Sequence, residues 1–233
     1  MKIHGGIFFN EDGISTSIRS MHLQTVLLDN INDNMIGYNK NGFQRKVPTV
    51  TSFAEIIGAH AFSEKNDTSV GRLRETRNPL DIALGKEGYF LYSTPQGNKT
   101  TRDGRFKMDK NGYLLTLENY KVLSSSGQPV KFNKIPDDLT NIKINLDGDI
   151  SLIDPTSKKV QQTIGKLAIV TDKGSPVKDI DVRQGFSEDS NVVLQNEVFG
   201  IIPVRRNFEA NRQLYIIQND ALSKTIQELG RAG

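Results

Sequence analysis

The chain has 233 residues, enough for one large or two modest domains with a substantial core. Hydrophobic residues make up 36% of it, below the ~45–50% of average globular domains. The formal net charge of +3 is spread over interspersed acids and bases, whereas a nucleic-acid-binding surface needs a clustered basic face. Cysteine is absent, which excludes disulfides and thiolate chemistry.

The N-terminal segment carries no recognisable targeting signal. Its sequence, MKIHGGIFFNEDG, lacks the apolar core that a secretory signal requires. No segment approaches the roughly 20 apolar residues of a membrane span. We therefore expect no membrane insertion, and a protein that stays in the cytosol or leaves it without a cleaved signal peptide.

Residues 14–36 carry the pattern of an amphipathic helix, and residues 1–12 are expected to be a loose leader before it. Ser15 or Thr16 can cap this helix, and Gly37 can end it. Positions alternately four and three residues apart form a heptad stripe, which one helix cannot bury alone. We therefore expect a partner helix. The stripe comprises Ile14, Ile18, Met21, Thr25, Leu28, Asn32 and Met35.

The partner is predicted near the C-terminus, between Val192 and Leu229, with Ser190-Asn191 as its cap. Pro203 lies inside this helix, which should therefore bend there or begin properly only at Pro203. Together the two stripes predict a coiled-coil unit formed by both ends of the chain. The second stripe comprises Ile201, Val204, Phe208, Asn211, Tyr215, Gln218, Leu222 and Leu229.

Between the helices the pattern changes to short strands separated by Gln-Gly, Asp-Gly and Asn-Gly turns, which is typical of an antiparallel meander. Residues 47–70 have a mixed pattern to which we assign no element. Strands are expected at 81–84, 88–94, 99–101, 105–108, 113–122, 142–144, 150–153 and 164–170.

The predicted fold class is therefore α+β, with a discontinuous helical coiled-coil unit and an inserted, mostly antiparallel β domain. We expect an N-terminal helical segment at 1–45, the β-rich domain at 46–189 and a C-terminal helical segment at 190–233.

No set of side chains predicts a catalytic, cofactor or metal site. The three histidines, His4, His22 and His60, do not have the spacing of metal ligands. Residues 109–112 resemble the start of a calcium loop, but its later ligands are missing. Residues 85–88 are too short for a phosphate loop, and no Gly-x-Ser-x-Gly elbow occurs. We therefore expect no enzyme and no cofactor.

Several segments resemble the bacterial flagellar rod and hook proteins. Residues 28–45, LDNINDNMIGYNKNGFQR, align without a gap with the family's LDVIANNLANANTTGFKR stretch. Residues 76–84 and 101–106 are similar to its T-x-N-x-LDLAI and YTRDGSF segments. Residues 190–211 resemble SNVNVVEEMVNMIEAQRAYEMN. The short span between the Gly-Phe turn and Thr76, together with Pro79, is most similar to the proximal rod protein, with the distal rod protein or a hook-type subunit as alternatives.

The resemblance implies a structural subunit of the flagellar basal-body rod, which polymerises into a hollow drive shaft that transmits torque. It further implies export by the flagellar type III apparatus, a place in the periplasm-spanning rod, and contacts with copies of itself and other rod proteins, without nucleic acid. A soluble module that binds a ligand on the β domain is the alternative of another class.

The resemblance also implies an assembly interface. Its polar members Asn34 and Asn211, together with Asn32, are expected to hydrogen-bond across helices and fix their register. The expected interface residues are Ile14, Ile18, Met21, Leu28, Ile31, Asn34, Asn39, Gly42, Phe43, Asn191, Val192, Glu197, Arg206, Phe208, Glu209 and Asn211.

Overall fold

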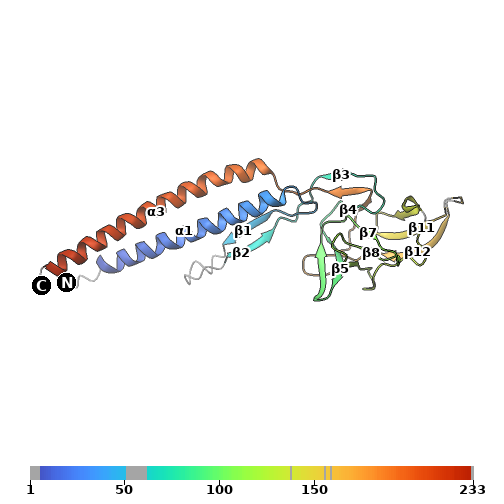
Figure 1. Cartoon of the computed structure of the whole chain (residues 1–233), viewed down its shortest axis with the longest axis horizontal. Helices are drawn as coiled ribbons and strands as arrows, with labels where there is room; N and C mark the ends of the chain where they lie inside the picture. Colours follow the sequence, from blue (N-terminus) through green and yellow to red (C-terminus); the bar gives the residue numbers. More distant parts are fainter. Residues whose placement is uncertain (1–5, 51–61, 137, 155, 158, 232–233) are drawn as a thin grey trace. The chain divides into compact units, whose positions relative to one another are not determined.

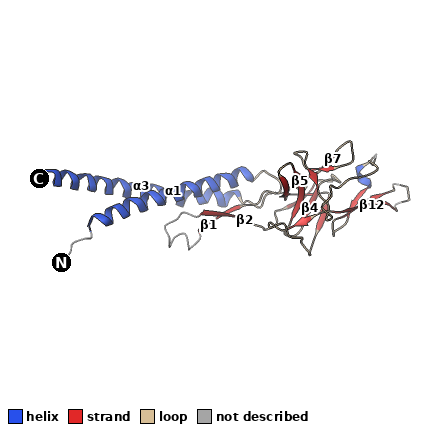
Figure 2. Cartoon of the chain, turned by 90° about the horizontal axis from the view of Figure 1, so that it is seen from below, coloured by secondary structure: helices blue, strands red, loops and turns tan. Residues whose placement is uncertain are grey.

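The computed structural model describes residues 6–50, 62–136, 138–154, 156–157 and 159–231. These residues divide into two compact units, each built from separate stretches of the chain. Unit 1 takes its residues from 1–36, 46–65 and 193–233, and unit 2 from 37–45 and 66–192. Both long helices belong to unit 1, whereas all but two of the described strands belong to unit 2 (Figure 2), and the fold class is α+β, as predicted.

Unit 1 contains two long helices and a two-stranded sheet. The helices are α1 (Gly6–Gly37) and α3 (Leu194–Arg231), and the strands are β1 (Lys46–Val50) and β2 (Phe62–Asn66). The helices lie side by side, with the start of α1 beside the end of α3 (Figure 1). They are therefore antiparallel.

The start of α1 differs from the prediction. The helix begins at Gly6, so residues 6–12 are helical, whereas residues 1–5 of the expected leader lie outside the described residues. Ser15 and Thr16 are interior positions and do not cap it. Glycine lowers helix stability by only about 1 kcal/mol relative to alanine and keeps its N–H donor, so Gly13 does not stop the helix.

The start of α3 also differs from the prediction. The carbonyl of Val193 accepts from the N–H groups of Asn196 at 3.0 Å and Glu197 at 3.3 Å, so the cap lies two residues after Asn191. The helix runs without interruption through Pro203, and the alternative of a start at Pro203 is wrong. Because proline has no N–H, the Phe199 carbonyl has no partner four residues later.

The larger sheet of unit 2 has six strands, in the order β13-β5-β9-β8-β7 with β6 paired to β5. All of these pairs are antiparallel. The strands are β5 (Tyr89–Thr94), β6 (Gly97–Thr101), β7 (Lys107–Met108), β8 (Leu114–Leu115), β9 (Lys121–Val122) and β13 (Ile169–Val170).

The smaller sheets of unit 2 are also antiparallel. A 3₁₀ turn at Leu139–Asn141 precedes a three-stranded sheet of β10 (Ile142–Ile144), β11 (Asp149–Ile153) and β12 (Val160–Lys166). Two further sheets each consist of two short strands, one from the beginning and one from the end of the unit 2 sequence. They join β4 (Ile82–Leu84) to β14 (Val182–Gln184), and β3 (Leu73–Glu75) to β15 (Phe186–Glu188).

The expected strands are largely present, but the meander is incomplete. Consecutive hairpins form between β5 and β6 and through β7, β8 and β9, whereas β9 then returns to pair with β5. The single strand expected at 164–170 is divided between two sheets, as β12 and β13. Strands β3, β14 and β15 were not predicted, because each short segment carries a charged or polar residue and shows no clear alternation.

One apolar core holds unit 2 together. Phe90 and Phe106 meet edge to face in it, with ring centroids 5.2 Å apart. The buried members of the core are Leu80, Ile82, Leu84, Phe90, Phe106, Leu114, Val122, Val130, Phe132, Ile142, Ile150, Leu152, Leu167, Ile169 and Val182. They come from all of the sheets except β3–β15, so the core joins these sheets into one unit.

A buried ion pair fastens the last strand of unit 2. Arg102 Nε donates to Glu188 Oε2 at 2.5 Å, and the two side chains are 1% and 3% exposed. The Arg102 guanidinium also donates to the carbonyls of Leu84, Lys86 and Gly88. Because each of the three guanidinium nitrogens donates to at least one acceptor, the pair meets the condition under which a buried charge is tolerated.

The substitution Arg102→Ala should destabilise the chain strongly, because it leaves the Glu188 carboxylate buried without its counter-charge. Breaking such a pair from one side costs ~3–5 kcal/mol. Urea unfolding followed by tyrosine fluorescence would measure the loss in free energy of unfolding. The control Arg183→Ala removes a more exposed pair with Asp181 and should cost at most about 1 kcal/mol. Equal, small effects of the two substitutions would contradict this account.

Candidate functional site

The face of α1 that contacts α3 is polar. Asn211 Nδ2 donates to Gln24 Oε1 at 3.4 Å, and Asn34 Nδ2 donates to Glu197 Oε2 at 3.3 Å. A Cβ added at Gly13 would lie 2.6 Å from Gln218 Nε2, so a glycine there permits close approach. As the residue number rises along α1, the number of the partner on α3 falls, as expected for antiparallel helices. The contacting positions follow a heptad spacing. The α1 positions on this face are Gly13, Ser17, Ser20, Gln24, Leu27, Ile31 and Asn34.

The stripe predicted on α1 is therefore shifted by one residue from the face that contacts α3. One residue corresponds to about 100° of rotation on a helix. Ile18 is 49% exposed, and Thr25 and Asn32 are exposed as well. Ile14, Met21, Leu28 and Met35 are half-buried. The prediction selected the more apolar of two neighbouring stripes, whereas side-chain hydrogen bonds place the polar one inside.

The stripe predicted on α3 is confirmed over most of its length. Its members from Ile201 to Leu222 are half-buried, whereas the residues between them are exposed. Glu197 continues the same spacing and is buried. Leu229 is 65% exposed and does not belong to the contact. Phe208 lies within the stripe, whereas Arg206 and Glu209 lie outside it and are exposed.

Asn34 is a buried polar group of this unit whose side-chain oxygen and nitrogen both form hydrogen bonds. It is fully buried, and its Oδ1 accepts from the N–H of Lys46 at 2.8 Å. Its Nδ2 lies 3.0 Å from the Lys46 carbonyl, in addition to the contact with Glu197. One carboxamide thus links α1, α3 and the first residue of β1. Of the three asparagines predicted to hydrogen-bond across helices, Asn34 and Asn211 do so within this chain, whereas Asn32 is exposed.

An exposed ion pair lies next to this carboxamide. The Lys46 ammonium donates to Asp33 at 2.7 Å and lies 3.4 Å from Glu64. The hydrogen bond to Asp33 is the main cause that raises the pKa of Lys46 above its ordinary value, and burial partly opposes it. The Lys46 ammonium therefore stays protonated across the neutral range and links the start of β1 to α1.

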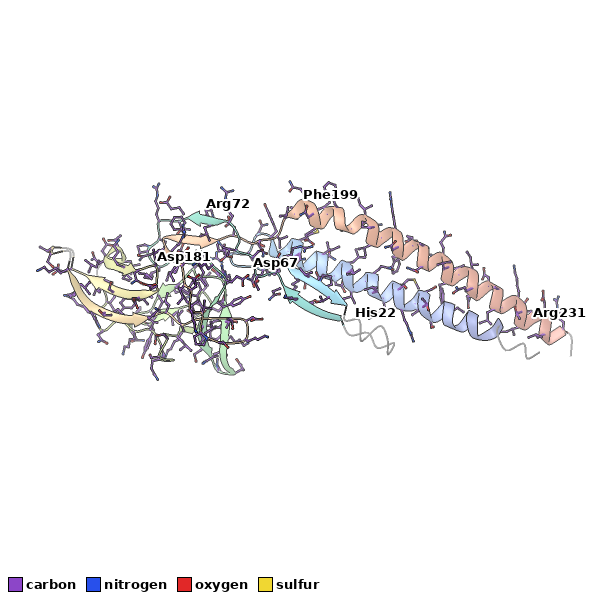
Figure 3. The ribbon with its side chains drawn as sticks, turned by 180° about the vertical axis from the view of Figure 1, so that it is seen from behind. His22, Asp67, Arg72, Asp181, Phe199 and Arg231 are labelled. Carbon is purple, nitrogen blue, oxygen red and sulfur yellow. The ribbon has the colours of Figure 1, made fainter. Side chains whose placement is uncertain are left out.

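The outer faces of both helices expose large apolar side chains. Phe199, labelled near the start of α3 in Figure 3, is 67% exposed. Leu194, Val198 and Ile202 follow one another at four-residue spacing and so share one side of α3, and contiguous exposed apolar surface is a sign of an interaction site. The exposed apolar residues of the helical unit are Ile18, Ile36, Val193, Leu194, Val198, Phe199, Ile202, Leu214, Ile216, Ile217, Ile226 and Leu229.

The turn that follows α1 requires two glycines. Gly42 has a φ of +65° and donates its N–H to the Glu188 carbonyl at 2.8 Å. A Cβ at Gly42 would lie 2.5 Å from the backbone nitrogen of Asp103. The Phe43 ring lies directly on Gly37, where any Cβ would collide with it. Asn39, predicted with this turn, is exposed.

Asn191 holds three stretches of unit 2 together. Its Oδ1 accepts from the N–H of Arg45 at 2.6 Å, and its Nδ2 donates to the carbonyls of Asp67 at 2.9 Å and Ser69 at 3.0 Å. Its own N–H donates to the Phe43 carbonyl at 3.3 Å. The side chain is thus fully used within unit 2, which explains why it does not cap α3.

A second buried amide near this turn was missed by the sequence analysis. Gln44 is buried and its Oε1 accepts from the hydroxyl of Tyr89 at 2.5 Å. Burial raises the pKa of Tyr89, and the hydrogen bond to Gln44 opposes that rise. The phenol therefore stays neutral and remains a donor. A polar residue that follows Gly-Phe in a turn gives no sequence signal for burial.

The described residues contain neither a metal-ligand group nor a membrane-spanning helix. Within them, no group of three or more His, Asp and Glu side chains is placed to hold a metal ion. His22 is exposed, whereas His4 and His60 lie outside the described residues. None of the helices, as far as they are described, is long and apolar enough to cross a bilayer.

Comparisons with known proteins match both units. The model of the flagellar hook protein FlgE/F/G D1 domain matches residues 83–152. The flagellar basal-body rod protein FlgF of Mesorhizobium japonicum is 32% identical to this chain, over 87% of the chain and 91% of the relative. FlgF of Rhizobium meliloti is 28% identical, over 94% and 98%. The rod protein FlgG of Bacillus subtilis is 29% identical, over 73% and 74%. This chain is a member of the flagellar basal-body rod protein family.

Proposed function

We propose that this protein is a structural subunit of the flagellar basal-body rod, where it polymerises into a hollow shaft that transmits torque. The observation that carries the proposal is the alignment with FlgF relatives over 87% and 94% of the chain, which takes in helical and β-rich parts alike. The function is structural, so the proposal assigns no reaction, cofactor or metal to the chain.

We place the subunit in the proximal part of the rod. The two FlgF relatives align over more of the chain than the FlgG protein of Bacillus subtilis, which aligns over 73%. The short span after the Gly-Phe turn and the presence of Pro79 favour the same position. A distal place in the rod is the alternative.

The helical unit is the proposed polymerisation element, as an antiparallel coiled coil. Its polar inner face fixes the register of α1 against α3, and its exposed apolar side chains, such as Phe199 and Ile217, are left to contact neighbouring subunits. A head-to-tail contact that does not close produces a helical polymer. Because removal of apolar area from water drives such association, these side chains supply the free energy of assembly.

The proposed division of labour follows the predicted domains. Residues 1–45 and 190–233 assemble the inner tube, and residues 46–189 form the outer layer. Neighbouring axial subunits, copies of this chain among them, are the proposed partners. We further propose that the chain reaches the basal body through the flagellar type III apparatus without a cleaved signal peptide, which its family membership supports.

Peptide mass spectrometry of detergent-washed hook–basal bodies tests the proposed function. The chain should be recovered in basal bodies, and a strain that lacks it should form no rod, hook or filament. The same strain carrying the gene on a plasmid is the control. Absence of the chain from intact basal bodies would refute the rod assignment.

Amide hydrogen exchange should distinguish the free subunit from the assembled one. Residues 14–35 should exchange quickly in the monomer, because the face of α1 that contacts α3 is largely polar and this helix therefore buries little apolar area of its own. The same amides should be protected in isolated rods, while the core strands of unit 2 are protected in both states. Strong protection of residues 14–35 in the monomer would contradict the coupling of helix order to assembly.

The substitution Phe199→Asp should block incorporation without unfolding the chain. Phe199 is 67% exposed, so a surface change there should alter the free energy of unfolding by no more than about 0.5 kcal/mol. Quantification in basal bodies should show a loss of about tenfold or more, whereas circular dichroism of the purified variant stays unchanged. The matched control is Gln195→Asp, on an exposed polar position of the same helix. Equal recovery of both variants would count against an apolar contact at Phe199.

A further inference from the structure

Unit 2 contains a polar cavity of about 360 Å³ that the proposed function does not yet use. Its walls come from the turn after α1, from the start of β3 and from the residues that follow β15. The side chains that matter for its chemistry are those of Lys40, Asn41, Arg72, Arg74 and Asp189. Figure 3 labels Arg72 on the β-rich unit.

The charge of the cavity is unbalanced. It is lined by three cationic side chains and one carboxylate. Arg74 Nε lies 3.3 Å from Asp189 Oδ1, so that carboxylate already has a partner. Among the described residues, neither the Lys40 ammonium nor the Arg72 guanidinium forms an ion pair or a side-chain hydrogen bond. Two positive charges that line the cavity, one from the turn after α1 and one from the start of β3, are thus left for a group from outside the chain.

Asn41 adds an independent sign of a missing acceptor. Its Nδ2 is shielded from solvent and has no hydrogen-bond partner among the described residues. A shielded donor without a partner is unfavourable, and such groups in native proteins are few. An oxygen-bearing anion in the cavity would give the amide an acceptor once the Asn41 side chain rotates toward it.

We propose that this cavity is the docking site for an Asp or Glu side chain of a neighbouring rod subunit. Arg72 can hold a carboxylate with two parallel N–H donors, Lys40 adds a point charge, and Asn41 provides a third donor. The inference rests on the proposed function, because it takes the partner to be another axial subunit.

The exposure of the walls favours a protein side chain over a small free anion. Lys40, Arg72 and Arg74 are all exposed, and Arg74 keeps 58% of its side-chain area. Small-molecule sites typically enclose 70–90% of their ligand, whereas an arginine at the rim of an interface remains wet until the partner covers it. Polar, charged contacts of this kind contribute mainly to register and specificity.

The first test measures binding of an acidic probe to the purified full-length chain. A blocked tetraglutamate peptide, titrated in a ¹⁵N-correlation experiment, should shift amides of residues 38–41, 72–74 and 189–190, and tetraglutamine should not. The double variant Lys40→Gln with Arg72→Gln should weaken binding about tenfold, since each exposed charge pair is worth up to about threefold to fivefold.

The control double variant, Lys99→Gln with Lys110→Gln, removes the same charge elsewhere on unit 2 and should weaken binding less than twofold. If both double variants weaken binding equally, or if shifts spread over all surface lysines, the peptide binds by net charge only and the proposed site is wrong.

The second test measures assembly in cells. Arg72→Glu should lower recovery of the chain in basal bodies severalfold, whereas Lys99→Glu should not. If wild type and Arg72→Glu are recovered equally, the docking site is wrong and the rod function stands. If wild type itself is absent from basal bodies, the proposed function fails, and this inference fails with it.

Discussion

The carboxamide of Asn34 donates to Glu197 and to the Lys46 carbonyl, and accepts from the Lys46 N–H. A fully buried amide that lost any of these partners would leave a polar group without compensation, at a cost of ~1–3 kcal/mol. The register of α1 against α3 is therefore fixed at this point, and a shift by one residue or one turn is unfavourable. Gln24 and Asn211 repeat the same constraint farther along the pair. This packing also explains why part of the apolar stripe of α1 is exposed. Because the polar face of α1 is turned toward α3, apolar residues such as Ile18 remain in contact with solvent.

In unit 2, too, a few contacts between residues far apart in sequence hold the structure together. They lie near the segments that connect unit 2 to the rest of the chain. The backbone carbonyl of Glu188 accepts from Gly42, and its carboxylate accepts from Arg102 and from the N–H of Gly71 at 2.9 Å. Asn191 extends these contacts to Arg45. Because the partners are far apart in sequence, their contacts form only when the whole unit folds.

The sequence predicted those parts of the structure that depend on local pattern. The C-terminal stripe from Ile201 to Leu222 and the hairpin strands with Gly-containing turns are of this kind. It failed where a distant partner decides between local alternatives. Asn191 is a good helix cap by residue type. Its side-chain oxygen, however, accepts a hydrogen bond from the backbone N–H of Arg45, 146 residues away. The stripe on α1 was misplaced because periodicity cannot tell which of two adjacent faces meets polar groups on another helix. The role of Arg102 depends on Glu188, 86 residues later, and no spacing rule indicates it.

The most direct test of this account is the register and facing of the helix pair in the assembled rod. The absence of native cysteine makes disulfide trapping clean. Cysteines introduced by Gln24→Cys and Asn211→Cys should form an intrachain disulfide in isolated basal bodies, seen as a faster band on a non-reducing gel. The pair Thr25→Cys and Asn211→Cys, which the apolar stripe would have brought together, should not. A disulfide in the second pair but not the first would show that the apolar face of α1 is turned toward α3, contrary to the polar interface described above.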